Sequence, residues 1–257
     1  MNARAMIDGE AVAAGRFARD GVSALAFDDE RSRMEAPEET PSYLRAQGAV
    51  HLTCDARRGR TRLANLRQEG ALNARFPRRE DDALEVVLIN IAGGVAAGDR
   101  HLVEASVKTG ARALLTSAAA EKVYRSPAAA SVIDVRLTID GSLEWLPQET
   151  ILFNEARLTR RMSVDMAADA SLLMAETVVL GRAAMGEEFR RGALRDQWRL
   201  RRAGELIYAD GVRLDGDVAN ILARSATASG ARSFATLLYV APDAEARLDE
   251  ARALVED

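Results

Sequence analysis

Apolar residues at every second position, interrupted by short turns, constrain the fold of this chain more than any other feature. The clearest example is a run of four alternating apolar residues, Ile133, Val135, Leu137 and Ile139, with polar residues between them. Successive side chains of a strand point to opposite faces, so this pattern predicts a strand with one buried face. Asp140-Gly141 follows and is a common hairpin turn, after which apolar alternation resumes.

Similar units recur along most of the chain. They lie at 50–65, 103–115, 133–145, 162–166 and 198–208, and turn residues interrupt or follow them, as in Arg57-Arg58-Gly59 and Ala203-Gly204. Five such units predict a mainly β protein, with antiparallel hairpins in two packed layers, a sandwich-like or β-helical scaffold. The units share no fixed sequence period, so a regular repeat is not expected.

Helices are expected at only two or three short places. A helix is predicted from Asp217 to about Thr227, and another after Asp243, which places Leu248, Ala251, Leu254 and Val255 on one face. The stretch Ala183–Leu194 is a weaker helical candidate. The alanine-rich stretch Ala111–Ala130 is interpreted as strands and loops, because Gly110 and Pro127 interrupt it.

Composition excludes several classes of protein. The net charge of −4 across 257 residues gives no field that would attract nucleic acid or an acidic membrane. Cys54 is the single cysteine, which excludes an internal disulfide and a thiolate-rich zinc site. The sequence has no long apolar run and no signal-peptide pattern, so we expect a cytoplasmic protein.

The first 41 residues differ from the rest of the chain. They are rich in Ala, Gly and charged residues and include the run Asp28–Arg33 and the prolines Pro37 and Pro41. Such a composition predicts a mostly disordered leader at 1–41, followed by one β-rich domain at 42–257.

The first motif is an apolar strand that enters a glycine-rich loop, Val87–Asp99. A phosphate-binding loop needs Lys and Ser or Thr directly after its last glycine. Here Gly98 precedes Asp99 and Arg100. The motif therefore indicates a turn in which backbones approach closely, and a nucleotide site is not expected.

Three further motifs follow in order. The first of these contains small hydroxylated residues and then Lys122-Val123-Tyr124-Arg125; the second is Leu143–Phe153, which includes Trp145 and is interrupted by Pro147. The third, Ala175–Glu187, contains Glu176, a carboxylate at the start of an apolar strand. A buried carboxylate is costly unless it is paired or functional.

These four motifs, in this order and at these spacings, resemble the UreD family of urease accessory proteins, called UreH in some bacteria. The resemblance covers roughly Tyr43 to Leu214 and includes Gly59-Arg60-Thr61 and Gly70-Ala71-Leu72. The family usually has a second Thr and a Gln or Pro where Ser117 and Ala118 stand. It also has a C-terminal stretch rich in Arg and Trp without a counterpart here, so we expect any partner contact of that stretch to be missing.

The resemblance implies a non-enzymatic scaffold of urease maturation. Family members bind apo-urease directly and recruit the accessory protein UreF, which carries the GTPase UreG. The family also implies a homodimer within the accessory complex, no permanently bound cofactor, and nickel in transit through an internal passage to a carbamylated dinuclear site. For this sequence, Lys122, Tyr124, Arg125 and Trp145 are the candidate partner-binding residues.

The residues themselves are compatible with that role. The chain has only two histidines, His51 and His101, and no set of catalytic residues emerges. A nickel passage needs dispersed oxygen ligands, because strong imidazole or thiolate clusters would retain the ion. Three carboxylates lie in the matching motifs, and we expect them to line the passage: Asp99, Glu149 and Glu176. The alternative is that each is paired with an arginine, such as Arg100 or Arg182.

His101 follows Asp99 by two residues and is the other metal-ligand candidate, whereas His51 and Cys54 point to opposite strand faces and cannot chelate jointly. Two other functions remain open. The first is a metal-dependent hydrolase that uses Asp99, His101 and Glu149, which would need at least three clustered ligands. The second is a β-rich interaction module that is unrelated to urease.

Overall fold

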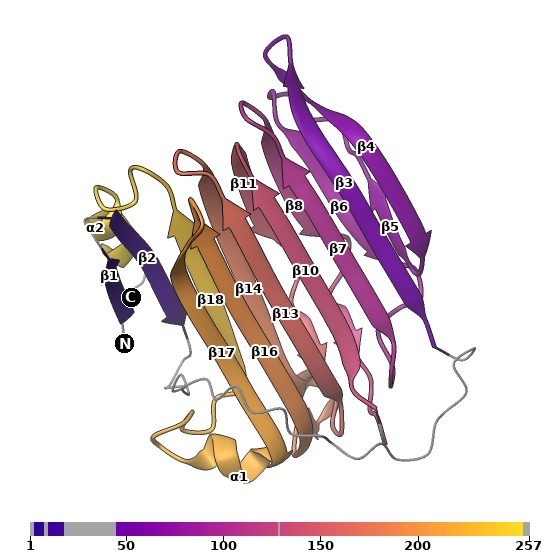
Figure 1. The fold of residues 1–257 in the computed structure, drawn as a ribbon. Coiled ribbons are helices and arrows are strands. Elements are labelled where there is room, and N and C mark those ends of the chain that lie inside the picture. Colours follow the sequence, from indigo (N-terminus) through magenta and orange to yellow (C-terminus); the bar gives the residue numbers. More distant parts are fainter. Residues whose placement is uncertain (1–2, 8–9, 18–44, 128, 254–257) are drawn as a thin grey trace.

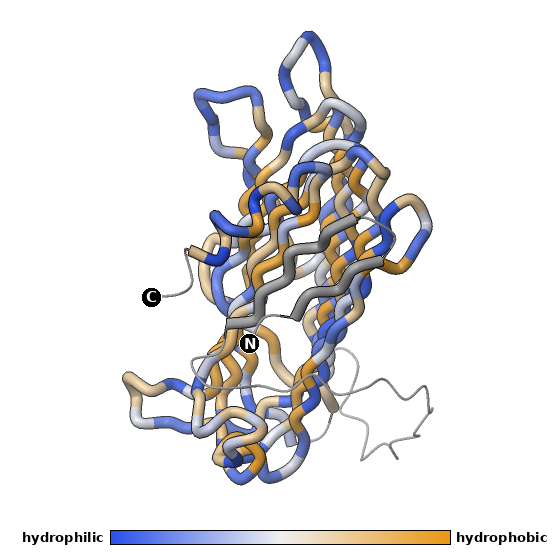
Figure 2. Tube along the Cα trace, turned by 90° about the vertical axis from the view of Figure 1, so that its left-hand side faces the viewer, coloured by the Kyte–Doolittle hydropathy of each residue, from blue (hydrophilic) through white to orange (hydrophobic). Residues whose placement is uncertain are grey.

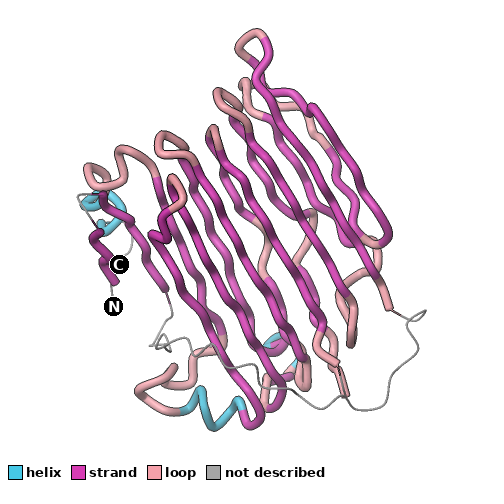
Figure 3. The backbone as a smooth tube through the Cα atoms, viewed as in Figure 1, coloured by secondary structure: helices cyan, strands magenta, loops and turns pink. Residues whose placement is uncertain are grey.

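The computed structural model describes residues 3–7, 10–17, 45–127 and 129–253. Strands dominate the described chain (Figure 3), and they form two sheets that pack face to face (Figure 1). Figure 2 views the two layers edge-on, with hydrophilic residues in the loops at their upper ends. The predicted mainly β architecture with two packed layers is confirmed.

In the described part of the chain, one sheet has seven strands and the other has eleven. The seven-stranded sheet has the order β17 (Glu205–Asp217), β16 (Arg191–Arg202), β13 (Arg157–Met166), β10 (Ser131–Ile139), β7 (Arg100–Val107), β3 (Gln47–Arg57) and β4 (Arg60–Gly70). The main path of the other sheet is β1 (Ala3–Ile7), β2 (Glu10–Phe17), β18 (Ser233–Val240), β14 (Ser171–Arg182), β11 (Ser142–Leu146), β8 (Arg112–Ser117), β6 (Leu84–Asn90) and β5 (Leu72–Arg75). Three short strands branch from that path: β9 (Glu121–Val123), β12 (Thr150–Leu152) and β15 (Glu187–Glu188).

The chain alternates between the two sheets, and this corrects the predicted antiparallel hairpins. Strands β7, β10, β13 and β16 lie in one sheet and β8, β11 and β14 in the other, and neighbours in each of these sets pair in parallel. Asp140-Gly141 therefore connects β10 in one sheet to β11 in the other. Alternation predicts a buried face in either case, because parallel and antiparallel strands share the two-residue period.

Close stacking of successive turns explains the glycine at this connection. The backbone N–H of Ser142 donates to the carbonyl of Ala111 at 3.0 Å, and that of Ser171 donates to the carbonyl of Gly141 at 3.0 Å. A Cβ atom at Gly141 would lie 2.4 Å from the Ala111 carbonyl oxygen. Only glycine allows the two backbones to approach this closely.

True hairpins occur at both edges of the seven-stranded sheet. The predicted β3–β4 and β16–β17 hairpins are confirmed, and both are antiparallel. At the edge of the other sheet, β1 and β2 pair with each other, and β2 pairs with β18. Both strands fall inside the predicted leader at 1–41. Residues 18–44 lie outside the described residues, so the domain boundary near Pro41 stays a prediction.

Two of the expected helices are present, and the third is wrong. Helix α1 (Val218–Ala223) is capped by the Asp217 side chain, which accepts from the Asn220 N–H at 3.2 Å. Helix α2 (Leu248–Ala253) begins later than predicted, and Leu254 and Val255 lie outside the described residues. The stretch Ala183–Leu194 forms only the 3-10 turn η2 (Ala183–Met185), because Gly186 ends it at φ 70° before β15 and β16 begin. None of the described helices is both long and apolar enough to cross a membrane.

Candidate functional site

A layer of polar side chains crosses the interior and separates two apolar clusters. On β13, Arg160 lies between Leu158 of the smaller cluster and Met162 of the larger one. Strands β14, β16 and β18 repeat this arrangement at the same level, with a buried polar residue between apolar neighbours: Glu176, Asp196 and Thr236. The interior is therefore polar along one band between the sheets.

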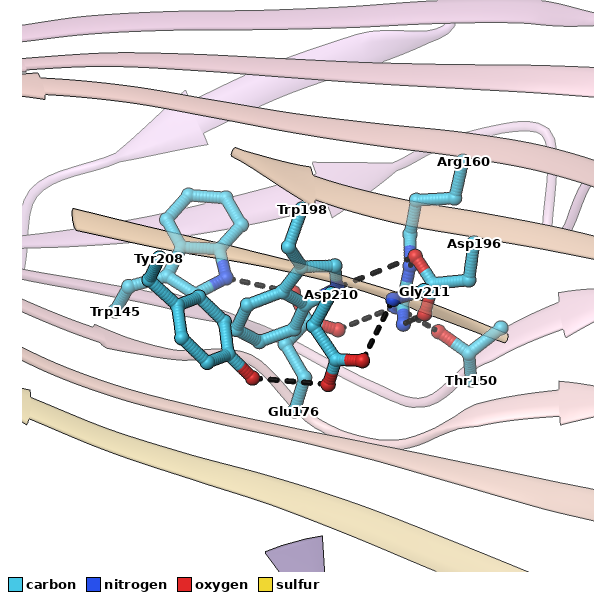
Figure 4. A network of polar contacts seen from close by, with 9 residues as sticks. All are labelled: Trp145, Thr150, Arg160, Glu176, Asp196, Trp198, Tyr208, Asp210 and Gly211. Atoms are coloured by element: carbon cyan, nitrogen blue, oxygen red, sulfur yellow. Dashed lines mark hydrogen bonds and ion pairs between the residues drawn. The ribbon is translucent and has the colours of Figure 1, made fainter. Parts of the chain in front are cut away.

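Arg160 is the centre of this layer (Figure 4). Its guanidinium donates to Asp196 through Nε at 3.0 Å and Nη2 at 2.5 Å, and its Nη1 donates to Glu176 on the opposite sheet. Nη1 also lies 3.3 Å from the Thr150 hydroxyl. Trp145 Nε1 donates to the second oxygen of Glu176 at 2.7 Å. The network thus joins the two sheets with every partner buried.

The charges of this network are strongly coupled. Burial raises the pKa of Glu176, although the Arg160 charge and the Trp145 hydrogen bond oppose that rise. Burial works against the charged form of Arg160, but the Asp196 and Glu176 carboxylates outweigh it and raise the pKa of the guanidinium. One cation therefore faces two carboxylates, and all three side chains are buried.

A cavity of about 190 Å³ lies between the sheets beside this network. Its inner wall includes Trp145, Thr150, Arg160 and Glu176. The opposite end is lined by exposed residues, so the cavity opens to the surface there; we call this end the mouth, defined by Gly93, Ala118, Ala119, Lys122 and Gln148. The polar network and the surface are thus linked by one continuous hollow.

Glu121 lines the cavity and has no cationic partner among the described residues. Its two carboxylate oxygens accept from Asn90 Nδ2 at 2.9 and 3.1 Å. Burial raises the pKa of Glu121 to about 7; the Asn90 hydrogen bond lowers it, and the Asp99 charge raises it further. The Glu121 carboxyl group is therefore not held by a cation, unlike that of Glu176, which pairs with Arg160.

His101 is the second available donor on the cavity wall. The residue is buried, and its Nε2 atom has no hydrogen-bond partner in the described structure. Burial lowers the pKa of His101, and the negative charge of Asp99 opposes this only partly. The ring is therefore neutral at pH 7, which is the form of imidazole that binds metal ions.

Comparison with known proteins decides the family. Residues 46–257 match the family model described as UreD urease accessory protein. The chain belongs to the UreD family. It is 52% identical over 229 residues to "Urease accessory protein UreD 2" of Methylorubrum populi, covering 86% of this chain and 77% of the relative. It is 49% identical over 218 residues to "Urease accessory protein UreD" of Azorhizobium caulinodans, covering 84% and 80%. The resemblance inferred from the motifs is confirmed.

The four metal-ligand candidates of this UreD chain separate into two groups. His101 and Glu176 line the cavity, whereas Asp99 and Glu149 do not. The Asp99 carboxylate accepts from the backbone N–H groups of Ala46 at 2.8 Å and Ala96 at 2.7 Å. It therefore closes the glycine-rich loop. Within the described residues, no three His, Cys, Asp or Glu side chains form a group that could hold a metal ion.

The partner-binding candidates also divide. Lys122, Tyr124 and Arg125 are exposed at or beside the mouth, so a partner can reach them. Trp145 was expected to bind a partner, but this is corrected: the side chain is 4% exposed and holds Glu176 inside the protein.

The sequence motifs converge around the mouth. The Tyr124 hydroxyl donates to the Gly93 carbonyl at 3.0 Å, and its ring meets the Phe153 ring edge-on with centroids 5.1 Å apart. The Arg182 guanidinium lies 4.0 Å from the centroid of Phe153. A Cβ atom at Gly94 would lie 2.6 Å from both the Lys122 carbonyl oxygen and the Tyr124 ring. The glycines of the UreD loop thus allow the backbone to pack against the Lys122–Arg125 segment.

Sequence reasoning missed three site residues: Glu121, Arg160 and Asp196. Arg160 is in phase with the alternating residues Met162 and Val164 of β13, so its inward position was readable. Its pairing with Asp196 was not, because that contact depends on which strands are neighbours. Glu121 directly precedes the Lys122–Arg125 motif, but nothing in the sequence indicated that it lines a cavity.

Proposed function

We propose that this protein is a non-catalytic scaffold of urease maturation that passes nickel ions through its interior to the urease apoprotein. Membership of the UreD family supports a role in urease maturation. The observation that supports nickel passage best is the pair of available donors on the cavity wall. Among the described residues, the Glu121 carboxylate has no cationic partner, and Nε2 of the neutral His101 ring has no hydrogen-bond partner.

Weak ligation is what a passage requires. Nickel binds imidazole and carboxylate donors, and a closed cluster of several such donors would retain it. Glu121 and His101 offer one donor each on a cavity wall that is otherwise largely apolar. Glu176 contributes negative charge to the inner end but has both oxygens engaged by Arg160 and Trp145. An ion on this route would make brief contacts and move on.

We also propose where the protein works and which proteins it binds. The protein works in the cytoplasm, binds apo-urease and UreF, and is linked to UreG through UreF. Lys122, Tyr124 and Arg125 beside the mouth form a surface that binds one of these partners. The hydrolase alternative is not favoured, because the set it would need, Asp99, His101 and Glu149, does not assemble into a metal-binding group among the described residues.

Reconstitution tests this function. Urease subunits are co-expressed with the other accessory proteins of the same organism, with and without this chain, and nickel per active site is measured by elemental analysis. We expect nickel-loaded, active urease only when the chain is present, and a stoichiometric complex with apo-urease and UreF by size-exclusion chromatography with mass determination. Equal nickel content without the chain would contradict the proposal.

A further inference from the structure

Arginines crowd the outer face of β16 and its two neighbouring strands. Alternate residues of β16 point away from the core, and four of them are arginines. With the outward arginines of β13 and β17 they form a set that we call the arginine face: Arg157, Arg161, Arg191, Arg195, Arg199, Arg201 and Arg213. In Figure 1 this sheet lies in front, so the arginine face is turned toward the viewer.

Elsewhere on the same sheet surface, several charges pair across strands. His51 of β3 lies 2.6 Å from Glu104 of β7, and Glu104 lies 2.6 Å from Arg136 of β10. Asp134 of β10 accepts two hydrogen bonds from Arg161 of β13 at 2.6 and 2.9 Å. In these three pairs, neighbouring charges of opposite sign bind each other across the strands.

Between β16 and β17, charges of the same sign face each other. Arg195 and Arg213 lie directly opposite each other in the antiparallel register. Both are exposed, and neither they nor Arg201 form a hydrogen bond or ion pair with a described residue. Like charges directly across a sheet are destabilising. The protein therefore retains the repulsion between Arg195 and Arg213, although a carboxylate at either position would replace it with an attraction.

The charge of the arginine face is opposite to that of the whole chain. Among outward residues of the same three strands, the acidic ones are Asp165, Asp215 and Asp217, fewer than half the arginines. The chain as a whole carries −4. Such a polarised surface attracts a negatively charged partner and orients it.

We propose that the arginine face docks a carboxylate-rich surface of the urease apoprotein. This rests on the proposed function. The guanidinium fork matches carboxylates in a bidentate manner. The aspartates within the arginine face disfavour the continuous phosphate backbone of a nucleic acid. Three strands about 14 Å wide and about 40 Å long present roughly 550 Å², much of the ~800 Å² that each partner buries in a stable complex. The mouth of the cavity stays free for other contacts.

Charge reversal separates docking from a structural role. Arg195→Glu puts an acid opposite Arg213, so the variant should be as stable as the wild type or more stable. The same change should weaken binding to urease apoprotein by about tenfold at low salt, and Arg195→Glu/Arg201→Glu should weaken it further. The matched control is Arg58→Glu/Arg78→Glu, two exposed arginines outside the arginine face. Dissociation constants are measured by biolayer interferometry at two salt concentrations, and melting temperatures by calorimetry.

Each outcome decides the proposal. Weaker binding of the arginine-face variants, unchanged binding of the control, and a salt effect that is larger for the wild type would support it. Equal binding by the wild type and Arg195→Glu/Arg201→Glu would overturn it and leave the proposed function intact. Failure of the wild type itself to bind urease apoprotein would overturn both. Tight binding of a DNA duplex that competes with urease would assign the arginine face to nucleic acid and also overturn it.

Discussion

Replacement of Arg160 by Met should be the most damaging single change in the interior. The side chain is 4% exposed and contacts both Asp196 and Glu176. Its removal leaves two buried carboxylates without a cation. Loss of one partner from a buried ionic group costs about 3–5 kcal/mol of the free energy of unfolding. Because a domain is stable by only about 5–15 kcal/mol, Arg160→Met should be close to unfolding at pH 7.

The pH dependence of this loss has a definite sign. Burial raises the pKa of Glu176 and the Arg160 charge lowers it, so without Arg160 the folded-state pKa of Glu176 rises further above its unfolded value of about 4. The folded variant then binds more protons than the unfolded chain, so its stability falls as pH rises. The deficit relative to the wild type should therefore be smaller at pH 5 than at pH 8.

Urea unfolding followed by tryptophan fluorescence measures the loss of stability in Arg160→Met. The chain has two tryptophans, and both belong to the network: Trp145 bonds to Glu176 and Trp198 to Asp196. The matched control is the neutral triple variant Arg160→Met/Glu176→Gln/Asp196→Asn, which should recover most of the lost stability. A loss below about 1 kcal/mol for Arg160→Met, or a triple variant no better than the single one, would refute the reasoning.

Two further predictions concern the cavity and its mouth. Because the folded pKa of Glu121 is raised to about 7 from 4.5, its contribution to stability is complete below pH 4.5 and is lost as pH rises through 7. Glu121→Gln should remove that dependence, worth at most about 3 kcal/mol in urea unfolding at pH 5 against pH 8; an unchanged slope would argue against a buried, protonated Glu121. Gly94→Ala adds a Cβ atom where φ is 141° and the Lys122 oxygen is 2.6 Å away. Gly94→Ala should lower the free energy of unfolding by about 1–3 kcal/mol, measured by thermal unfolding. Gly93→Ala, which has open space around the added Cβ atom, should lower it less.

The sequence predicted inward and outward positions well, because alternation depends only on the strand period. Leu137 and Ile139 are buried, while Arg136 and Thr138 are exposed, as the pattern indicates. The hairpin of β3 and β4 followed from its turn residues. The parallel pairing of β7, β10 and β13 did not, because the two-residue alternation is the same whether a turn closes a hairpin or carries the chain to a second sheet.

Contacts between strands that are distant in the sequence are the part of the candidate site that could not be predicted from the sequence. Glu176 was recognised as a buried carboxylate, and an arginine partner was considered. That partner is Arg160, whereas Arg182, one of the two arginines considered, pairs with Glu187. The Glu176–Arg160 contact joins β14 and β13 across the two sheets. Such a contact follows from the stacking of the sheets, which no local pattern of residues encodes.

The most direct test of the account is the rate of nickel transfer into urease apoprotein through Glu121. Purified accessory complex containing wild-type chain, Glu121→Gln or Glu149→Gln is mixed with apo-urease and nickel, and nickel per active site is followed over time at pH 7.5. Glu149 is the matched control, because it is a half-buried carboxylate that does not line the cavity. The account predicts severalfold slower loading with Glu121→Gln, normal loading with Glu149→Gln, and intact complexes in both. Normal loading with Glu121→Gln would contradict a nickel route through this cavity.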